Sequence, residues 1–465
     1  MSDQSTLTAE TGTRSAVAGG APVRAGRRLT GWDPENPAQW ENGGRRIAAR
    51  NLVFSVFAEH VGFSVWSLWS VMVLFMTPAY GLDPGEKFLL VSVATGVGAL
   101  MRLPYTYAVA RFGGRNWTIV SALLLLLPTV LGLAVMTPGT SFRTFLLVAA
   151  VTGLGGGNFA SSMANINSLY PERRKGWALG LNAGGGNLGV PAVQLVALTV
   201  IATAGLTAPR LVLGVYLPLI VLAALGAALF MDNLDGLRND TGALREVLGY
   251  GHTWAMSFLY IGTFGSFIGF GFAFGLVLQT QFGRTPLEAA YVTFLGPLLG
   301  SLVRPLGGAL ADRYGGARVT RWTFVALAAG AGVLLAATEA RSLGVFTAGF
   351  VAVFVLTGIG NGSTYKLIPA VFRARAATAV AGGASYPEEA ARARRLSGAL
   401  IGLAGAIGAL GGLLVNLTFR AAYAPDPATG IAGSGTAAYA AFLGFYVVCA
   451  LVTAVAYRHD RPLET

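Results

Sequence analysis

The sequence has few charged residues and almost no cysteine. Only 12% of its 465 residues are charged, 54% are apolar, and the mean hydropathy is +0.60. A water-soluble surface does not tolerate so apolar a composition, which argues against a soluble enzyme or binding module and indicates a membrane protein. The single cysteine, Cys449, excludes an intrachain disulfide and a cysteine metal site.

Clusters of reactive or metal-binding residues are also lacking. The chain has no clustered nucleophile, no set of metal ligands and no paired carboxylates, so we expect no enzyme, no metal and no cofactor. Residues 1–46 contain no apolar core of signal-peptide length. Their Ser, Thr, Gly, Pro and Arg content predicts a disordered cytoplasmic tail.

Long apolar runs are abundant. About 20 apolar residues span a bilayer as a helix, and runs of that length recur along the chain, which predicts an all-α membrane protein with twelve transmembrane helices. The predicted spans are 50–80, 88–110, 117–137, 143–169, 177–203, 210–231, 253–282, 288–311, 320–338, 344–371, 397–422 and 437–457.

The net charge of +12 lies almost entirely in short loops. Nucleic-acid binding is therefore the weaker reading of this charge, and the positive-inside rule is the stronger one. Most Lys and Arg residues fall on the side of the two termini, which predicts an inner or plasma membrane protein with both termini in the cytoplasm.

The two halves of the chain look like copies. Arg102-Leu-Pro leads to Arg111-Phe-Gly-Gly, and Arg304-Pro leads to Arg313-Tyr-Gly-Gly. Such parallel six-helix repeats are the architecture of major facilitator transporters, with the substrate site between the halves. The segment from Gly308 to Arg318 also resembles a loop motif of that superfamily. We expect bundles at 47–231 and 253–458, a linker at 232–252 and a cytoplasmic tail at 459–465.

Three cations fall inside predicted spans, namely Arg102, Arg304 and Lys366. A cation at the centre of a membrane helix costs about 2.5–3.5 kcal/mol, so it normally faces the protein interior and marks function. Arg102 and Arg304 occupy equivalent positions, and a planar guanidinium suits a planar oxyanion, which predicts a small anion as substrate. The alternative is that each Arg snorkels or caps a helix carbonyl, and Lys366, near the cytoplasmic end of its span, fits snorkelling equally well.

Polar and small residues gather in the fourth, fifth and tenth spans. Interhelical hydrogen bonds and close helix contact explain most of them, while one or two are candidates for substrate contact. Glycine faces also suit the rocking of one half against the other. The set is Gly155, Gly156, Gly157, Asn158, Asn165, Gly184, Gly185, Gly186, Asn187, Gly360, Asn361 and Gly362.

The segments Gly153-Leu-Gly-Gly-Gly-Asn-Phe-Ala-Ser-Ser-Met-Ala-Asn-Ile-Asn and Gly358-Ile-Gly-Asn-Gly-Ser-Thr-Tyr-Lys resemble the two glycine-rich signatures of the nitrate/nitrite porter family. The resemblance implies that Arg102 and Arg304 bind nitrate or nitrite. It further implies that Phe159 and Phe264 sandwich the anion and that Tyr260 and Asn187 donate hydrogen bonds to it.

The coupling mode has two alternatives. Two facing arginines repel when the site is empty, so a carrier that reorients only when loaded would exchange nitrate for nitrite. Proton-coupled uptake is the alternative, with Glu59 and His60 as titratable candidates in the first span, although a structural ion pair explains Glu59 equally well. An organic-anion or sugar-phosphate carrier and a membrane sensor are the rival functions. We expect a monomer.

Overall fold

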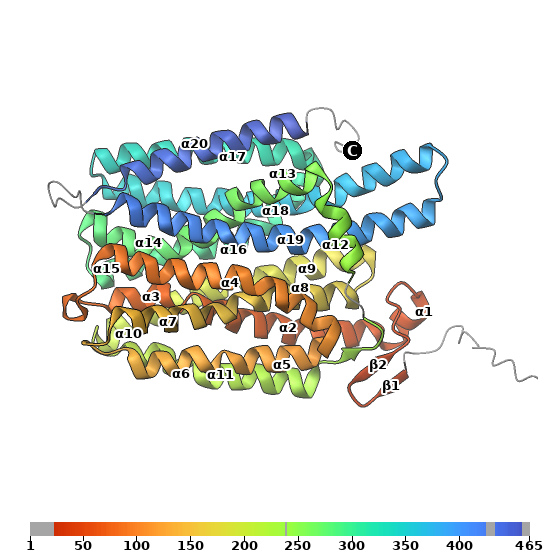
Figure 1. Ribbon diagram of the computed structural model, residues 1–465, viewed down its shortest axis with the longest axis horizontal. Coiled ribbons are helices and arrows are strands. Elements are labelled where there is room, and N and C mark those ends of the chain that lie inside the picture. The colour runs from red at the N-terminus through yellow and green to blue at the C-terminus, as the bar shows by residue number, and fades with distance from the viewer. Residues whose placement is uncertain (1–22, 238–239, 425–432, 458–465) are drawn as a thin grey trace, which may run out of the picture.

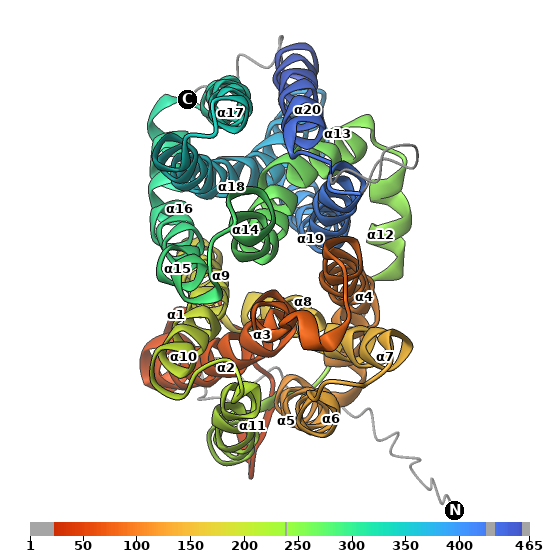
Figure 2. The same ribbon diagram turned by 90° about the vertical axis from the view of Figure 1, so that its left-hand side faces the viewer.

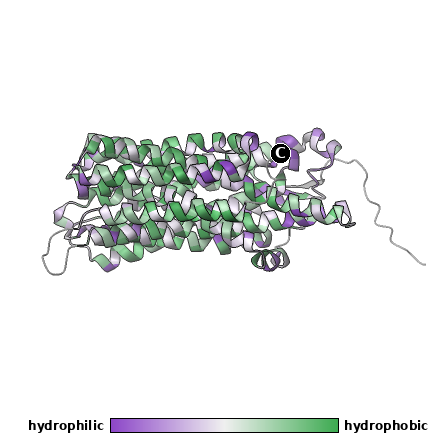
Figure 3. Ribbon diagram, turned by 90° about the horizontal axis from the view of Figure 1, so that it is seen from above, coloured by the Kyte–Doolittle hydropathy of each residue, from purple (hydrophilic) through white to green (hydrophobic). Residues whose placement is uncertain are grey.

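The computed structural model describes residues 23–237, 240–424 and 433–457. In these residues twelve helices are long and apolar enough to cross a membrane. Hydrophobic residues cover most of the length of these helices, and hydrophilic residues gather toward their ends (Figure 3). The predicted all-α fold with twelve spans is confirmed. Expectations for residues 1–22 and for the tail at 459–465 lie outside the described residues.

The first six spans form the N-terminal half. Several of them are interrupted by short irregular turns, so one span often contains two helices. These spans comprise α2 (Arg45–Trp66), α3 (Leu68–Phe75), α4 (Pro84–Phe112), α5 (Gly114–Leu124), α6 (Leu126–Val135), α7 (Phe142–Thr152), η3 (Gly153–Gly157), α8 (Asn158–Leu169), α9 (Glu172–Asn187), α10 (Gly189–Ala204) and α11 (Pro209–Phe230).

The last six spans form the C-terminal half. They comprise α13 (Gly251–Tyr260), η4 (Ile261–Gly265), α14 (Ser266–Phe282), α15 (Pro286–Thr293), α16 (Leu295–Tyr314), α17 (Gly316–Glu339), α18 (Leu343–Ala381), α19 (Tyr386–Ala422) and α20 (Thr436–Ala456). The end-on view shows the two halves as bundles that meet where α3 faces α14, α4 faces α19 and α10 faces α15 (Figure 2).

The remaining elements lie outside the bundles. They are β1 (Val23–Ala25), β2 (Arg28–Thr30), α1 (Pro37–Gln39), η1 (Trp40–Gly44), η2 (Pro78–Tyr80), β3 (Asn233–Leu234) and α12 (Thr241–Leu248). The strands, α12 and the described C-terminus lie at one end of the molecule, which we call the terminal end (Figure 1, right). The opposite end, which carries η2, is called the far end.

Matching turns and caps confirm that the halves are copies. Helices α4 and α15 both begin with a capping box and a proline, Asp83-Pro84 with Glu86 and Thr285-Pro286 with Glu288. Helices α4 and α16 both end at a glycine with φ of 87°, Gly113 and Gly315. An L side chain is strained at that φ, so the two Gly-Gly motifs of the sequence make equivalent turns.

Residues 23–44 form ordered elements, where the sequence analysis expects a disordered tail. β1 pairs antiparallel with β2, and β2 pairs parallel with β3 of the linker. Leu29 and Trp40 are buried, and Glu35 accepts a hydrogen bond of 2.8 Å from the backbone N–H of Glu172. The composition of the tail does not reveal these contacts, because every partner lies far along the chain.

Asp232, directly before β3, joins the linker to α2 of the bundle. Its Oδ2 atom lies 2.5 Å from Nη2 of Arg50 and accepts a hydrogen bond of 2.9 Å from Asn51. The Asp232 side chain is fully buried, whereas Asp235, which pairs with Arg28 at 3.1 Å, is 35% exposed. Asp232 and Asp235 therefore make similar ion pairs with arginine but differ in the burial of the carboxylate.

We expect Asp232→Ala to lower the melting temperature of the purified protein by several degrees, because breaking a buried ion pair costs about 3 kcal/mol. The control Asp235→Ala removes an exposed pair worth about 1 kcal/mol or less and should change the melting temperature much less. Thermal unfolding of both variants in the same detergent measures the difference, and equal shifts would contradict a stabilising role for Asp232.

Helices α18 and α19 extend beyond the predicted spans 344–371 and 397–422, so most of the segment between these spans is helical. The two helices project from the terminal end as a hairpin (Figure 1). Helix α12 docks on it, with Glu246 2.6 Å from Arg392 and Asp240 2.5 Å from Arg395. The hydrogen bond from Arg395 holds the pKa of the Asp240 carboxyl below its usual range. The C-terminal turns of α18 and the N-terminal turns of α19 are rich in charged residues, so hydropathy does not identify them and the predicted spans do not include them.

Candidate functional site

Arg102 lies in α4 and crosses to the opposite half of the molecule. Its side chain is 1% exposed, and its Nη1 atom donates a hydrogen bond of 2.9 Å to the carbonyl of Gly405 in α19. Among the described residues, its Nε and Nη2 atoms have no hydrogen-bond partner although both are buried. Buried N–H groups of a cation are expensive to leave unpaired, so these donors are available to an anion.

Arg304 occupies the equivalent place in α16. It is 6% exposed, and its Nη2 atom donates a hydrogen bond of 3.2 Å to the hydroxyl of Tyr260. Its Nη1 atom has no hydrogen-bond partner in the part of the chain that the structure describes. Both arginines face the protein interior, and neither snorkels to an end of the bundle. Arg102 does bind a helix carbonyl, as the alternative for these residues allows, but this contact leaves two of its nitrogen atoms unpartnered.

Aromatic rings connect the two arginines. The guanidinium carbon of Arg102 lies 4.5 Å from the ring centre of Phe159 and 4.9 Å from that of Phe264, which are cation–π distances. The Phe264 ring stacks on Tyr260 at 5.2 Å, and Tyr260 reaches Arg304. Tyr260 directly precedes the π-helical turn η4, and Phe264 lies within that turn. The predicted residues Arg102, Arg304, Phe159, Tyr260 and Phe264 thus form one cluster.

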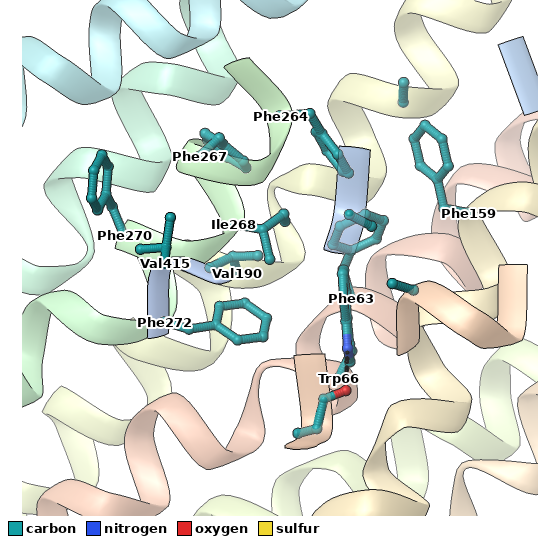
Figure 4. Packing of buried hydrophobic residues seen from close by; sticks show 14 of the residues in the cluster. Phe63, Trp66, Phe159, Val190, Phe264, Phe267, Ile268, Phe270, Phe272 and Val415 are labelled. Atoms are coloured by element: carbon teal, nitrogen blue, oxygen red, sulfur yellow. Dashed lines mark hydrogen bonds between the residues drawn. The ribbon is translucent and has the colours of Figure 1, made fainter. Parts of the chain in front are cut away.

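The rings of Phe159 and Phe264 come from opposite halves and face each other (Figure 4). Their centres are 5.9 Å apart with an angle of 30° between the planes. A planar anion between two rings needs about 3.5 Å on each side, so the rings must separate before they sandwich a substrate. In this conformation the guanidinium of Arg102 lies against both rings.

A cavity of about 60 Å³ borders this cluster. Arg102, Phe159 and Tyr365 line its inner part, and Thr106, Asn167 and Gly398 lie closer to the terminal end. Arg304 is not among the lining residues, but Tyr365 is, and its ring centre lies 5.5 Å from the guanidinium carbon of Arg304. The cavity therefore extends from Arg102 toward the terminal end.

The far end is closed by contacts between the halves. Trp66 packs edge-on against Phe272 at 5.4 Å, and Phe88 stacks on Tyr423 at 5.5 Å. The side-chain amide of Gln194 donates a buried hydrogen bond of 2.8 Å to the carbonyl of Gly271. A central site that is sealed from one end and extends toward the other is the geometry of one state of an alternating-access carrier.

The sequence pattern of the Major Facilitator Superfamily matches residues 52–386. The nitrate/nitrite transporter NarU of Salmonella typhimurium is 36% identical over 457 residues, which cover 94% of this chain and 97% of that protein. This chain belongs to the nitrate/nitrite porter family of the Major Facilitator Superfamily. The predicted family is confirmed, and its members are transporters rather than enzymes.

Two further comparisons place this porter among its relatives. The probable nitrate/nitrite antiporter NarK2 of Thermus thermophilus is 30% identical over 386 residues, which cover 77% of this chain and 86% of that protein. The crystal structure of a D-xylose-proton symporter superimposes with a TM-score of 0.64 at 17% identity and covers 87% of this chain and 95% of the symporter. The second comparison concerns the fold alone.

Glu59 and His60 of the porter lie apart from the cavity lining. Glu59 is fully buried, and its Oε2 atom accepts hydrogen bonds of 2.5 Å from Ser162 and 2.6 Å from Asn182. These hydrogen-bond partners are neutral, although Glu59 also interacts electrostatically with Arg102 and Arg304, as the structural alternative of a neighbouring cation expects. His60 Nδ1 lies 3.1 Å from the carbonyl of Gly185. In the sequence, only the serine and asparagine residues at helical spacing in the fourth and fifth spans indicated that polar side chains such as Ser162 and Asn182 would meet between helices.

Lys366 is exposed near the terminal end and pairs with Asp312, with Nζ 2.7 Å from the carboxylate. It therefore lies outside the anion cluster and joins α18 to α16. The position of Lys366 agrees with the snorkelling alternative. Its ammonium group, however, pairs with the carboxylate of Asp312 in the superfamily loop motif and not with the membrane surface. The motif around Asp312 and the Lys366 signature were both visible in the sequence, but nothing there indicated their pairing.

Most signature glycines lie where helices touch. A Cβ atom at Gly156 would lie 2.6 Å from the backbone of Gly98, and one at Gly362 would meet the backbone of Arg304. The other close contacts are Gly155 with Gly62, Gly157 with Tyr105, Gly185 with Val56, Gly186 with Glu59 and Gly360 with Thr263. Gly184 is the exception, since a Cβ there would have nothing within 4 Å, so the expected close contact at Gly184 is wrong in this conformation.

The predicted amides are buried but leave hydrogen-bonding atoms free. Both side-chain amide atoms of Asn158, Asn165 and Asn187 and the Oδ1 atom of Asn361 lack partners among the described residues. Three contacts of the cluster were missed, namely the ring of Trp66, whose centre is 5.4 Å from the Arg102 guanidinium carbon, the ring of Tyr365 and the carbonyl of Gly405. Tyr365 stands inside the second signature, whereas a backbone carbonyl leaves no trace in sequence.

Proposed function

We propose that this porter carries nitrate and nitrite across the membrane by alternating access. The observation that carries the proposal is the pair of buried guanidinium groups, one from each half, whose N–H donors at Arg102 and Arg304 lack protein partners. Two buried cations with open N–H donors, and only Glu59 as a carboxylate in their electrostatic surroundings among the described residues, favour a bound anion, and the substrate supplies it. The named relatives, a nitrate/nitrite transporter and a nitrate/nitrite antiporter, support this choice of anion.

The lining of the site favours a small planar oxyanion over an organic phosphate. Aromatic rings surround the Arg102 guanidinium, and apart from Thr106, Asn167 and the hydroxyl of Tyr365 the rest of the cavity lining is apolar, which leaves few groups to bind the hydroxyls of a sugar. A planar fork of donors matches a planar oxyanion on two edges, while the rings pack against its face. Organic anions are rivals that the sequence alone leaves open, and this lining argues against them.

Competition in proteoliposomes tests the substrate class. Uptake of labelled nitrate should be inhibited by unlabelled nitrate and nitrite at similar concentrations, and hardly at all by acetate or glycerol 3-phosphate. Strong inhibition by glycerol 3-phosphate would contradict the proposal and indicate that the substrate is an organic anion. Liposomes without protein provide the background for every anion.

We place the protein in the inner or plasma membrane with its terminal end in the cytoplasm. Lys and Arg residues gather at that end of the bundle, as the positive-inside rule requires. In this orientation the cavity extends toward the cytoplasm and the closed far end faces outward. One chain supplies both arginines of the site, which supports a monomer as the transporting unit.

We propose exchange as the coupling mode. Without an anion, closing the two halves around the site brings two positive charges together in a medium of low dielectric constant, which is unfavourable. A bound anion removes this penalty, so the loaded carrier reorients and the empty one does not. Nitrate entry then depends on nitrite exit. The Thermus relative, named as an antiporter, supports this mode.

Substitution of Glu59 tests whether transport is exchange or proton-coupled uptake. It accepts hydrogen bonds from Ser162 and Asn182 and does not line the cavity, so we assign it a structural role. We expect Glu59→Gln, which keeps an acceptor oxygen, to retain at least about a third of the exchange rate, a change of less than 1 kcal/mol in the barrier. Rates of nitrate/nitrite exchange at fixed pH on both sides measure this.

A matched pair of variants controls the Glu59 experiment. Glu59→Ala leaves Ser162 and Asn182 without their buried acceptor and should reduce the amount of folded porter, which size-exclusion chromatography reports. If Glu59→Gln instead abolishes an uptake that a pH gradient drives in the wild type, Glu59 carries a proton and the exchange proposal fails.

A further inference from the structure

Tyr365 borders both the cavity and the second arginine. It lies in α18 and lines the cavity together with Arg102 and Phe159. Its ring centre is 5.5 Å from the guanidinium carbon of Arg304 and 6.0 Å from the ring of Tyr260. Tyr365 therefore links the Arg102 side of the site, whose cavity it lines, to the Arg304 side.

The hydroxyl of Tyr365 is buried and has no hydrogen-bond partner among the described residues. Buried hydroxyl groups are normally paired, because an unpaired donor loses its hydrogen bonds to water without replacement. Tyr446 and Tyr423 follow this rule, since Tyr446 donates to Ser266 at 2.7 Å and Tyr423 donates to Gln281 at 2.5 Å. The buried hydroxyl of Tyr105 also lacks a partner, but Tyr105 does not line the cavity, whereas Tyr365 does. The Tyr365 hydroxyl is therefore an unpaired donor placed where a bound anion can meet it.

We propose that the Tyr365 hydroxyl donates a hydrogen bond to the bound anion and selects nitrate over nitrite. The inference rests on the proposed function. Arg102 has two unpartnered nitrogen atoms and Arg304 has one, and together they bind two oxygen atoms of either anion. Nitrate has a third oxygen to accept the hydrogen bond of Tyr365, whereas nitrite has only two oxygen atoms. A site built around a hydrogen bond discriminates against an analogue that lacks the partner atom.

The variant Tyr365→Phe tests this proposal because it removes the hydroxyl and keeps the ring beneath Arg304. We expect the KM for nitrate to rise about tenfold, in line with a lost hydrogen bond to a charged group. The KM for nitrite should change less than about threefold. The measured quantity is the ratio of the two KM values, which a purely structural role of the ring would leave unchanged.

Tyr105→Phe is the matched control. The Tyr105 hydroxyl is also buried and without a hydrogen-bond partner in the described residues, but Tyr105 packs on Trp117 at 4.9 Å and does not line the cavity. Its removal should leave both KM values unchanged. The same effect on the KM ratio in both variants would overturn the proposal, because it would not depend on the cavity.

The outcomes separate this inference from the proposed function. If the wild type transports neither nitrate nor nitrite, the proposed function fails. If the wild type transports both and Tyr365→Phe raises both KM values equally, or neither, the function stands and the selectivity role is overturned. Nitrate-induced thermal stabilisation of the purified variant gives a second readout that does not need transport, and an unaltered shift with nitrate would also overturn the role.

Discussion

Replacing either buried arginine by lysine abolishes nitrate transport in our account, with a loss of at least about a hundredfold in uptake rate, equivalent to about 2.7 kcal/mol. A lysine ammonium keeps the charge but not the planar fork. In Arg102→Lys the cation loses its position over Phe159 and Phe264, 4.5 and 4.9 Å from the ring centres. The three N–H donors of lysine also radiate from a single nitrogen atom, so they cannot match the Gly405 carbonyl and a planar oxyanion as the separate nitrogen atoms of the guanidinium do. Uptake into proteoliposomes measures the effect.

The repeat supplies matched controls for both variants. Arg111 lies on the same helix as Arg102, and Arg313 lies on the same helix as Arg304, but both controls are exposed near the terminal end. Arg111→Lys and Arg313→Lys should transport nitrate at nearly the wild-type rate. Normal transport by Arg102→Lys or Arg304→Lys would contradict the proposal that both guanidinium groups bind the anion. A variant with a raised KM and an unchanged maximal rate would assign that arginine to substrate capture only.

Valine at Gly156 should reduce transport to a few per cent of wild type or less while the protein still inserts into the membrane. A Cβ atom there would lie 2.6 Å from the Cα atom of Gly98, and backbone cannot move aside as a flexible side chain does. Overpacking of this kind costs about 1–3 kcal/mol, and it separates α4 from η3 beside Arg102. The site would then lose both its geometry and its smooth contact surface.

Gly184→Val is the control because a Cβ atom at Gly184 meets nothing within 4 Å. Both substitutions put valine into a glycine-rich segment, and only their packing differs. Membrane content by immunoblot and nitrate uptake are measured for the two variants together. Equal uptake by Gly156→Val and Gly184→Val would contradict the role of close packing, as would a Gly156→Val protein that fails to reach the membrane.

The sequence was sufficient for the spans and for the main cations of the site. A membrane demands about 20 apolar residues for each span and penalises buried charge, so hydropathy reports the helices and Arg102 and Arg304 stand out against it. The repeat then predicted that the two arginines lie at equivalent places. The aromatic and amide assignments came from the resemblance to a known family, and the structure joins Phe159, Tyr260 and Phe264 to the arginines.

The parts that sequence did not predict depend on contacts between distant segments. The strand pairing of residues 23–30 with the linker and the pairing of Lys366 with Asp312 join elements whose relation only the fold sets. The Gly405 carbonyl is backbone, and Tyr365 looks like one aromatic residue among many in apolar helices. At Gly184 the sequence predicted a close contact that the structure does not show, because a Cβ atom there would have nothing within 4 Å in this conformation.

Nitrate uptake into proteoliposomes preloaded with nitrite, compared with liposomes preloaded with buffer, tests the central claim most directly. Our account predicts uptake only with internal nitrite, no stimulation by a pH gradient, and no uptake by Arg102→Lys or Arg304→Lys. Gradient-driven uptake into liposomes that contain only buffer would contradict exchange and make Glu59 and His60 the next residues to substitute.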